Sequence, residues 1–347
     1  MKRKITIAVT GLNATDNPGS GIPVIRSLRE SKLFDVRIVG LSYETLEPGI
    51  YLHELVDKTY LIPLPSQGTH NLVRRLKQIQ EKENIEVIIP NFDSELFNFI
   101  KVRNELAQLG IRSFLPDEQQ FESRQKIQLA KFGKDHGITV PRSATIYSAS
   151  ELNNLPAELQ YPIVVKGKFY DAGIAHYPAQ AQQLYTSIYE KWGGPLILQE
   201  VIKGQEVNVT AIGDGKGNLC GMVAMRKQYI TDKGKAWSGI SIKDQSLHAL
   251  AERFMQSTKW RGPCELEIIK TDDNTNYLIE VNPRFPAWMY LATGCGQNHA
   301  EQLIQLALEQ PVTVYDDYEA GKLFIRYSFD LLVDLKEYER ISTQNEL

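Results

Sequence analysis

Two strand-like segments in the last third of the chain carry acidic residues at alternating positions. Residues 264–270 and 277–282 are rich in β-forming side chains, and the six residues between them favour a turn. A hairpin centred on that turn places Glu267 directly opposite Glu280. Because side chains alternate along a strand, one face of this hairpin is expected to carry four polar residues. These are Glu265, Glu267, Glu280 and Asn282.

Two carboxylates that oppose each other across a hairpin repel and weaken the sheet. A divalent cation between Glu267 and Glu280 would remove that repulsion. The set contains oxygen ligands and neither His nor Cys, which favours Mg²⁺ completed by water and phosphate oxygens. Asn282 adds a carbonyl oxygen, and Arg284 adds a fixed positive charge just after the strand. We therefore predict a metal site; the alternative is a solvated outer face on which Asn282 and Pro283 merely end the strand.

Candidate phosphate and nucleotide contacts lie upstream of this hairpin. The apolar segment 162–166 ends in Lys166 beside a glycine, where a lysine can meet a phosphate that backbone N–H groups also wrap. A second apolar segment passes into Gln199-Glu200-Val201-Ile202, whose backbone can hydrogen bond to an adenine edge, and Glu206 can accept from ribose hydroxyls. Taken singly, each of these charged residues is better explained as a strand-end side chain in water.

The elements that must position these residues follow two patterns. Up to Pro116, strand-like and helix-like segments alternate, which predicts a parallel sheet with right-handed crossovers in a Rossmann-like unit. The expected strands are 5–9, 36–41, 85–89 and 111–115, and the expected helices are 22–28, 71–82 and 95–106.

After Pro116 the pattern changes. Two helical segments over 118–132 are followed mainly by strands separated by turns such as 213–218, which predicts antiparallel hairpins. The expected strands are 161–166, 196–201, 207–212, 219–226, 264–270 and 277–281. The predicted fold class is therefore α/β followed by α+β.

Length and composition exclude several classes of protein. A chain of 347 residues is expected to form two or three domains. Its 39 basic and 42 acidic residues leave a net charge of −3, which gives no electrostatic reason for a nucleic-acid or anionic-membrane partner. The three cysteines are far apart, and the CxxC and HExxH patterns are absent, which disfavours zinc ribbons, redox centres and disulfide scaffolds. We expect a cytoplasmic protein.

The order of the candidate residues resembles the ATP-grasp superfamily, most closely its biotin carboxylase and carbamoyl-phosphate synthase branch. The Glu-x-Asn-Pro-Arg element at 280–284 is the specific part, and the resemblance runs from Ile5 to about Glu309. It implies a Rossmann-like pre-ATP-grasp domain followed by the two-lobed ATP-grasp fold. The implied boundaries are 1–116 for the first domain, 117–200 for the small lid lobe with its connecting helices, 201–330 for the C-terminal lobe with the Mg-ATP site, and 331–347 for a tail.

The resemblance implies which residues bind ATP. Lys126 and Lys166 would contact the phosphates from the two lobes. Related enzymes carry several Gly and Ser residues after the second lysine, whereas Lys168, Phe169 and Tyr170 fill much of that space here. We therefore expect a shorter lid in which Lys168 substitutes for backbone N–H contacts. The residues expected at the adenine and ribose are Glu200, Val201, Ile202 and Glu206.

The same resemblance assigns the metal and the transferred group. Glu267 and Glu280 would bridge two Mg²⁺ ions, with Asn282 on the second and Mn²⁺ as an alternative metal. Arg284 would stabilise charge on the phosphoryl group and the acyl intermediate. Arg226 is expected at another phosphate or substrate contact.

The resemblance implies an ADP-forming carboxylate–amine ligase, which phosphorylates a carboxylate and couples the acyl phosphate to an amine. Its substrates would be small molecules or peptides, and the oligomeric state is open, a homodimer included. The alternatives are a bicarbonate-phosphorylating enzyme and a nucleotide-binding regulatory protein without turnover. An oxidoreductase is disfavoured because the loop 11–21 lacks the G-x-G-x-x-G spacing.

Two further segments have two interpretations each. Asp93 and Glu95 follow a predicted strand and can either bind substrate or belong to a helix start capped by Asp93 or Ser94. The aromatic segment 285–290 can either wall a substrate pocket or anchor the core.

Overall fold

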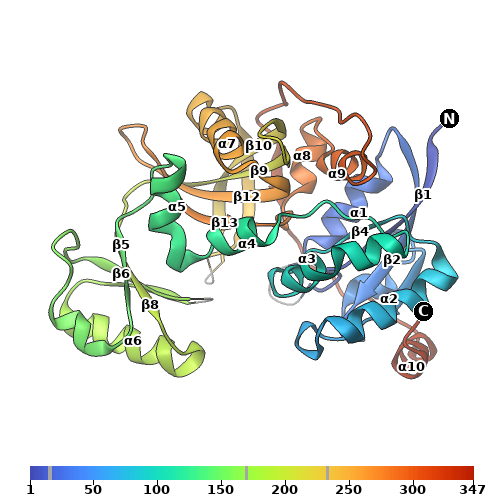
Figure 1. The fold of residues 1–347 in the computed structure, drawn as a ribbon, viewed down its shortest axis with the longest axis horizontal. Coiled ribbons are helices and arrows are strands. Elements are labelled where there is room, and N and C mark those ends of the chain that lie inside the picture. Colours follow the sequence, from blue (N-terminus) through green and yellow to red (C-terminus); the bar gives the residue numbers. More distant parts are fainter. Residues whose placement is uncertain (15–17, 169–170, 232–233) are drawn as a thin grey trace. The chain divides into compact units, whose positions relative to one another are not determined.

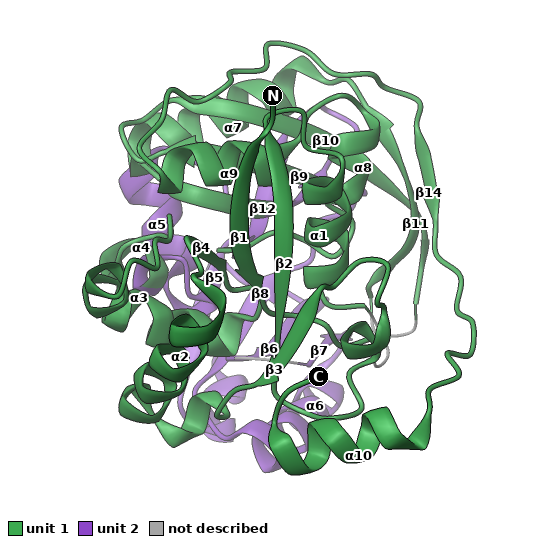
Figure 2. Cartoon of the chain, turned by 90° about the vertical axis from the view of Figure 1, so that its right-hand side faces the viewer, with its two compact units in different colours: residues 1–121, 208–265, 282–347 green, residues 122–207, 266–281 purple. Residues whose placement is uncertain are grey.

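The computed structural model describes residues 1–14, 18–168, 171–231 and 234–347 (Figure 1). The chain divides into two compact units (Figure 2). The larger unit comprises residues 1–121, 208–265 and 282–347, and the smaller unit comprises residues 122–207 and 266–281.

The larger unit begins with a four-stranded parallel sheet. Its order is β3-β2-β1-β4, and each neighbouring pair is parallel. The predicted parallel sheet is therefore confirmed. The strands and their helices are β1 (Arg3–Val9), α1 (Gly21–Arg29), β2 (Phe34–Ser42), β3 (Lys58–Leu61), α2 (Thr69–Glu83), β4 (Val87–Ile89) and α3 (Asp93–Gln108).

Side-chain alternation explains how this sheet is buried on both faces. Ile5, Ile7 and Val9 of β1 pack in one apolar cluster with residues of α1, whereas Ala8 packs in another with residues of α2 and α3. Helix α1 also contacts α8 (Tyr290–Gly294) and α9 (His299–Ala307), so elements from both ends of the chain cover the same face.

A six-stranded sheet follows in the order β13-β12-β9-β10-β11-β14. Its neighbouring strands β10 and β11, and β11 and β14, pair antiparallel, as the turn-rich pattern predicts. The strands are β9 (Gln205–Asp214), β10 (Leu219–Ile230), β11 (Ala236–Ile242), β12 (Arg261–Lys270), β13 (Asn276–Asn282) and β14 (Leu323–Ile325). The remaining helices of the larger unit are α7 (Gln245–Thr258) and α10 (Leu335–Gln344), with short 3₁₀ turns η1 (Pro48–Tyr51) and η2 (Pro65–Gln67). Helix α4 (Glu118–Ser123) begins in the larger unit and ends in the smaller one.

The smaller unit contains an antiparallel sheet in the order β5-β8-β6-β7. Its apolar side chains cluster with those of α6. The elements are η3 (Lys126–Gln128), α5 (Leu129–His136), β5 (Ser143–Ile146), η4 (Ala149–Asn153), β6 (Ile163–Gly167), β7 (Ala172–Ala175), α6 (Pro178–Trp192) and β8 (Leu196–Glu200).

The segment expected as a strand at 111–115 differs from the prediction. Within it, only Arg112 forms a bridge, to Val87 of β4. The segment runs straight into Pro116, which has no N–H to donate to a ladder and so stops the pairing.

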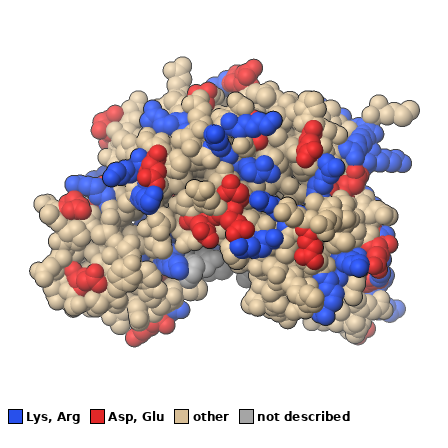
Figure 3. Space-filling model, viewed as in Figure 1, with Lys and Arg blue, Asp and Glu red and all other residues tan. Residues whose placement is uncertain are grey.

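Among the described residues, no helix is both long and apolar enough to cross a membrane. On the face drawn in Figure 3, basic and acidic side chains are interspersed, in keeping with the nearly balanced charge.

Candidate active site

The predicted phosphate contact Lys126 and the predicted metal ligand Glu280 form an ion pair in the smaller unit. Lys126 lies in η3 and Glu280 lies on β13, and the Lys126 Nζ–Glu280 Oε2 distance is 3.1 Å. Their side chains are 27% and 28% exposed, so both are accessible to a ligand. An ion pair this exposed contributes little to stability. Its opening would therefore cost little when a phosphate or a metal ion competes for the two groups.

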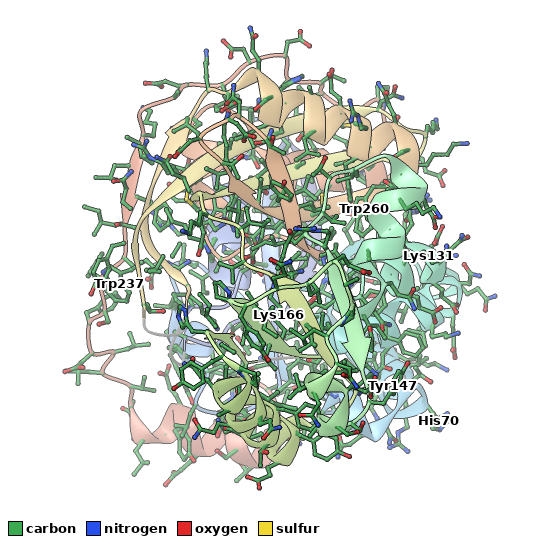
Figure 4. All side chains as sticks on the ribbon, turned by 90° about the vertical axis from the view of Figure 1, so that its left-hand side faces the viewer. His70, Lys131, Tyr147, Lys166, Trp237 and Trp260 are labelled. Carbon is green, nitrogen blue, oxygen red and sulfur yellow. The ribbon has the colours of Figure 1, made fainter. Side chains whose placement is uncertain are left out.

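Lys166 lies near the end of β6 (Figure 4), and charged residues from other elements act on it. Burial, together with the positive charge of Lys126, lowers the pKa of Lys166 to about 8. The negative charges of Glu280, Glu267 and Glu206 act in the opposite direction. One lysine and three carboxylates, from η3, β9, β12 and β13, therefore lie close enough to act on the charge of Lys166.

The chemistry of this group suits a magnesium–nucleotide complex. No group of three or more His, Cys, Asp or Glu residues forms a metal cluster within the described part of the chain. A Mg²⁺ ion held by Glu267 and Glu280 would thus take its other ligands from water and phosphate, which is the usual way that Mg²⁺ binds in nucleotide sites. The two lysines offer positive charge to the same phosphates.

The predicted adenine and ribose contacts lie where β8 ends and β9 begins. Glu200 is the last residue of β8, and its carboxylate accepts hydrogen bonds from the Arg142 backbone N–H at 2.7 Å and from Arg142 Nε at 2.8 Å. Its carboxylate therefore joins the start of β5 to the end of β8. Val201 and Ile202 follow, both partly buried, and Glu206 is exposed on β9.

Gly204 fixes the path of this connection. A β-carbon on Gly204 would lie 2.3 Å from the carbonyl oxygen of Lys270, closer than any real contact. Glycine is therefore required for the β8–β9 connection to pass against β12.

Lys168, the predicted substitute for backbone donors, is partly buried after β6. The other two residues of that predicted lid, Phe169 and Tyr170, lie outside the described residues.

Glu265 is the centre of a buried network in the larger unit. Its carboxylate is 6% exposed and accepts hydrogen bonds from Asn208 Nδ2 at 2.7 Å, Trp288 Nε1 at 2.7 Å and Asn282 Nδ2 at 3.0 Å. A carboxylate accepts and does not donate, so Asn282 must present its NH₂ group to Glu265. This leaves the carbonyl oxygen of Asn282 for another partner. Trp288, and with it the aromatic segment after the hairpin, is anchored in the core by the same carboxylate.

Arg284 is held by Asp93. The Arg284 Nε–Asp93 Oδ2 distance is 2.7 Å, and Arg284 Nη1 donates to the carbonyl of Phe285 at 3.2 Å. Asp93 is the first residue of α3, and its carboxylate forms the ion pair with Arg284. Arg226 is exposed on β10 and forms no ion pair with any of the described residues.

Glu95 forms a second buried network at the ends of β1 and β4. It accepts hydrogen bonds from the hydroxyls of Thr10 and Tyr43, and from the backbone N–H groups of Asn91 at 2.7 Å and Phe92 at 3.0 Å. Burial raises the pKa of Glu95 to about 7, and these hydrogen bonds oppose that shift. Its hydrogen bond from Phe92 N–H satisfies a donor at the start of α3.

Sequence reasoning missed Arg326, which directly follows the short strand β14. Burial lowers the pKa of its guanidinium to about 10, while the negative charge of Glu265 opposes the shift. Arg326 Nη1 is buried, and no described residue accepts a hydrogen bond from it. A three-residue strand carries too little periodicity to be recognised in advance, so no sequence signal pointed to Arg326.

The cysteines do not offer a nucleophile. All three are buried and free. Burial raises the pKa of Cys295, raises that of Cys220 to about 12, and raises that of Cys264 further. The thiolate is the reactive form, so these side chains are inert near neutral pH.

Comparison with known proteins finds a family match over the part of the chain that contains Lys126, Lys166 and Glu280. Residues 123–287 match the family model of the ATP-grasp domain. The large chain of carbamoyl phosphate synthase from Agathobacter rectalis is 24% identical over 248 residues, which cover 67% of this chain and 22% of that protein. The present chain thus spans about a fifth of the length of that relative.

Solved structures share the fold at low sequence identity. A biotin carboxylase–β,γ-ATP complex from Campylobacter jejuni matches with a TM-score of 0.71 and 16% identity, over 92% of this chain and 74% of that one. An L-amino acid ligase from Bacillus licheniformis matches with a TM-score of 0.66 and 15% identity, over 89% and 75%. The predicted ATP-grasp fold and its resemblance to the biotin carboxylase and carbamoyl-phosphate synthase branch are confirmed.

Proposed function

Because this chain carries an ATP-grasp domain over residues 123–287, we propose that it is an ADP-forming carboxylate–amine ligase. The observation that supports this most strongly is the group of charges around Lys166. Lys126 and Glu280 form an ion pair there, and Glu267 and Glu206 also act on the charge of Lys166. Positive charges for phosphate beside carboxylates for a metal ion suit a magnesium–triphosphate complex.

The reaction proceeds in two steps. A carboxylate oxygen of the first substrate attacks the γ-phosphorus of ATP, the bond to the β-phosphate oxygen breaks, and ADP leaves. The nitrogen of an amine then attacks the acyl carbon, and inorganic phosphate leaves with one of the original carboxylate oxygens. Mg²⁺, when bound, neutralises phosphate charge in the first step.

The residues of this chain supply binding, orientation and positive charge. Lys126 and Lys166 would hold the phosphates, and phosphate binding would restore the proton affinity that burial removes from Lys166. Glu267 and Glu280 would hold the metal, together with the carbonyl oxygen of Asn282.

Arg284 would stabilise charge on the transferred phosphoryl group. Its orientation is fixed by Asp93, so little reorganisation is needed during the reaction. Arg226 would make a further contact to phosphate or substrate. The adenine and ribose would be held by residues 200–202 and by Glu206.

A screen for ADP release tests the proposal. Amino acids, dipeptides and small organic acids are offered in pairs with ATP and Mg²⁺, and products are identified by mass spectrometry. Active pairs are then assayed with Glu280→Gln, which should abolish ADP release, and with Asp272→Asn in the exposed turn of the same hairpin, which should not. Full activity of the Glu280→Gln variant would refute the site assignment.

Bicarbonate phosphorylation is the second candidate, because the similar proteins include a carbamoyl phosphate synthase large chain and a biotin carboxylase. ADP release that depends on bicarbonate and on no other carboxylate would establish it instead. A nucleotide-binding protein without turnover would release no ADP with any substrate pair.

A further inference from the structure

Strand β14 lies at the margin of the larger unit, as the last strand of the six-stranded sheet (Figure 2). It pairs antiparallel with β11, and no other strand of the described residues pairs with it. The Arg326 backbone N–H donates to the Trp237 carbonyl at 3.0 Å, and the Lys322 carbonyl accepts from the Ser241 N–H at 2.8 Å. Backbone groups alternate in direction along a strand, so those of the odd-numbered residues between Lys322 and Arg326 point away from β11. This edge is therefore open to a further strand.

One face of the same edge is apolar. Leu323 and Ile325 are 54% and 65% exposed, whereas Phe324 between them packs against a buried apolar cluster. The alternation continues past the strand, because Tyr327 and Phe329 are 79% and 65% exposed and their ring centroids lie 5.8 Å apart. The four side chains at positions 323, 325, 327 and 329 thus form an exposed apolar stripe, which we call the 323–329 stripe.

The 323–329 stripe has the size of a contact between proteins. Its four side chains present on the order of 500 Å² of apolar surface, since a large aromatic side chain alone buries about 150–250 Å². A contiguous exposed patch of about this size often marks a binding surface. If each of two copies buried about 500 Å² of side chain and strand edge, the total of about 1,000 Å² would reach the lower limit for a specific interface.

The charges that flank the stripe favour a second copy of this chain as its partner. Lys322 precedes the stripe and Asp330 follows it. Antiparallel pairing of two copies about a two-fold axis at Arg326 places Lys322 of each copy opposite Asp330 of the other. A parallel arrangement in register would instead oppose like charges.

The same register matches the apolar side chains and the open backbone groups. Position 323 then faces 329, and position 325 faces 327, so every cross-strand pair on this face is apolar. These odd-numbered residues are also the ones whose backbone groups point away from β11. Arg326 lies at the axis with its side chain on the other face, where the negative charge of Glu265 acts on it.

We propose that this chain forms a two-fold symmetric dimer in which residues 322–330 of two copies pair antiparallel. The pairing joins the two six-stranded sheets along their β14 edges, and each stripe packs against the flank of the other. This interface goes beyond the proposed ligase reaction and does not depend on it.

Sedimentation equilibrium of the full chain without ATP tests the proposal. We expect a reversible dimer with a dissociation constant of about 10 μM, because an interface near the lower size limit gives modest affinity. Ile325→Lys places a charge in the middle of the open edge and should weaken the dimer about a hundredfold or more. The matched control is Tyr147→Lys in the smaller unit, where Tyr147 is 73% exposed, and it should leave the dissociation constant unchanged. Both variants change exposed side chains and should leave thermal unfolding of the monomer unchanged.

A charge exchange tests the register. Lys322→Glu opposes two carboxylates at both ends of the interface and should weaken the dimer about tenfold. Adding Asp330→Lys should restore the wild-type dissociation constant. Lys322 also pairs with Glu319 of its own chain at 3.1 Å, and the double variant does not restore that contact, so recovery identifies the pair between copies.

Three results would overturn the proposal. They are a monomer at a chain concentration of about 100 μM, a dimer that persists in Ile325→Lys, and a double variant as weak as Lys322→Glu alone. Because ATP and substrates are absent, none of these results depends on whether the chain is a ligase.

Discussion

Replacement of Glu265 by Gln tests the network that orients Asn282. The wild-type carboxylate receives Asn208 and Trp288 at Oε1 and Asn282 at Oε2. Glutamine has one oxygen and one NH₂ group. If its oxygen keeps the two partners at Oε1, its NH₂ group opposes the NH₂ group of Asn282 across 3.0 Å. Asn282 must then rotate its amide and turn its carbonyl oxygen toward residue 265.

The energetic cost follows from the three hydrogen bonds. Hydrogen bonds to a charged group contribute about 1.5–3 kcal/mol each, against about 0.5–1.5 kcal/mol between neutral groups. Two bonds weakened by about 1 kcal/mol each, and a third rearranged, lower the free energy of unfolding by about 2–4 kcal/mol. Arg326 also loses the negative charge that faces it in a buried position.

Two measurements read out this change. Urea unfolding followed by circular dichroism gives the loss of stability. Titration of ADP release with Mg²⁺ gives the metal requirement, and we expect the half-activating Mg²⁺ concentration to rise about tenfold, because about 1.4 kcal/mol of ligand binding is lost with the carbonyl of Asn282. The matched control is Glu105→Gln, which replaces an exposed carboxylate.

A double variant separates orientation from simple destabilisation. In Glu265→Gln with Asn282→Asp, the new amide donates to the new carboxylate, and an oxygen ligand at position 282 is restored. This pair should recover most of the metal affinity lost in the single variant. If Glu265→Gln matches the wild type in both stability and Mg²⁺ dependence, the reasoning is wrong.

The remaining predictions concern charges whose environments differ from water. ATP affinity, measured by calorimetry, should fall as pH rises above about 8, because Lys166 loses its proton there, and Lys166→Arg should hold its affinity to higher pH. For Glu95, the pKa of about 7 lies above the ordinary 4.5, so the folded protein keeps a proton that the unfolded chain releases between these values. The free energy of unfolding should therefore fall by about 3 kcal/mol from pH 4.5 to pH 7, at 1.36 kcal/mol per pKa unit, and urea titrations of Glu95→Gln should show a flatter dependence. Asp93→Asn should lower kcat about tenfold or more while ATP affinity stays unchanged, since Arg284 loses the partner that fixes its orientation; an unchanged kcat would argue against that role.

The alternation of strands and helices was sufficient to predict the parallel sheet, because its strands contain short apolar segments rich in Ile and Val and are separated by helix-like segments. Glu267 and Glu280 could also be singled out as candidate metal ligands, because acidic residues that face each other in strand-like segments conflict with a purely structural role. The family resemblance assigned Lys126 to the ATP phosphates and Glu280 to the metal, whereas their ion pair, between residues far apart in the sequence, was not predicted.

Other contacts depend on the tertiary fold. Arg142 meets Glu200 only because β5 and β8 pair antiparallel in one register. The residues that line the cavity at the carboxyl edge of the parallel sheet follow four different strands, and no local pattern in the sequence indicates that they converge. Glu265 was expected on the metal-binding face, but its burial beneath Asn208 and Trp288 depends on side chains from other segments.

The most direct test of the ligase mechanism is the fate of the carboxylate oxygen. A carboxylate substrate labelled with ¹⁸O is incubated with the chain, ATP, Mg²⁺ and its amine partner, and the phosphate is analysed by mass spectrometry. An acyl phosphate intermediate predicts ADP as the nucleotide product and one ¹⁸O atom in each inorganic phosphate, with both products lost in Glu280→Gln. Release of AMP, or of ADP with unlabelled phosphate, would contradict the proposed reaction.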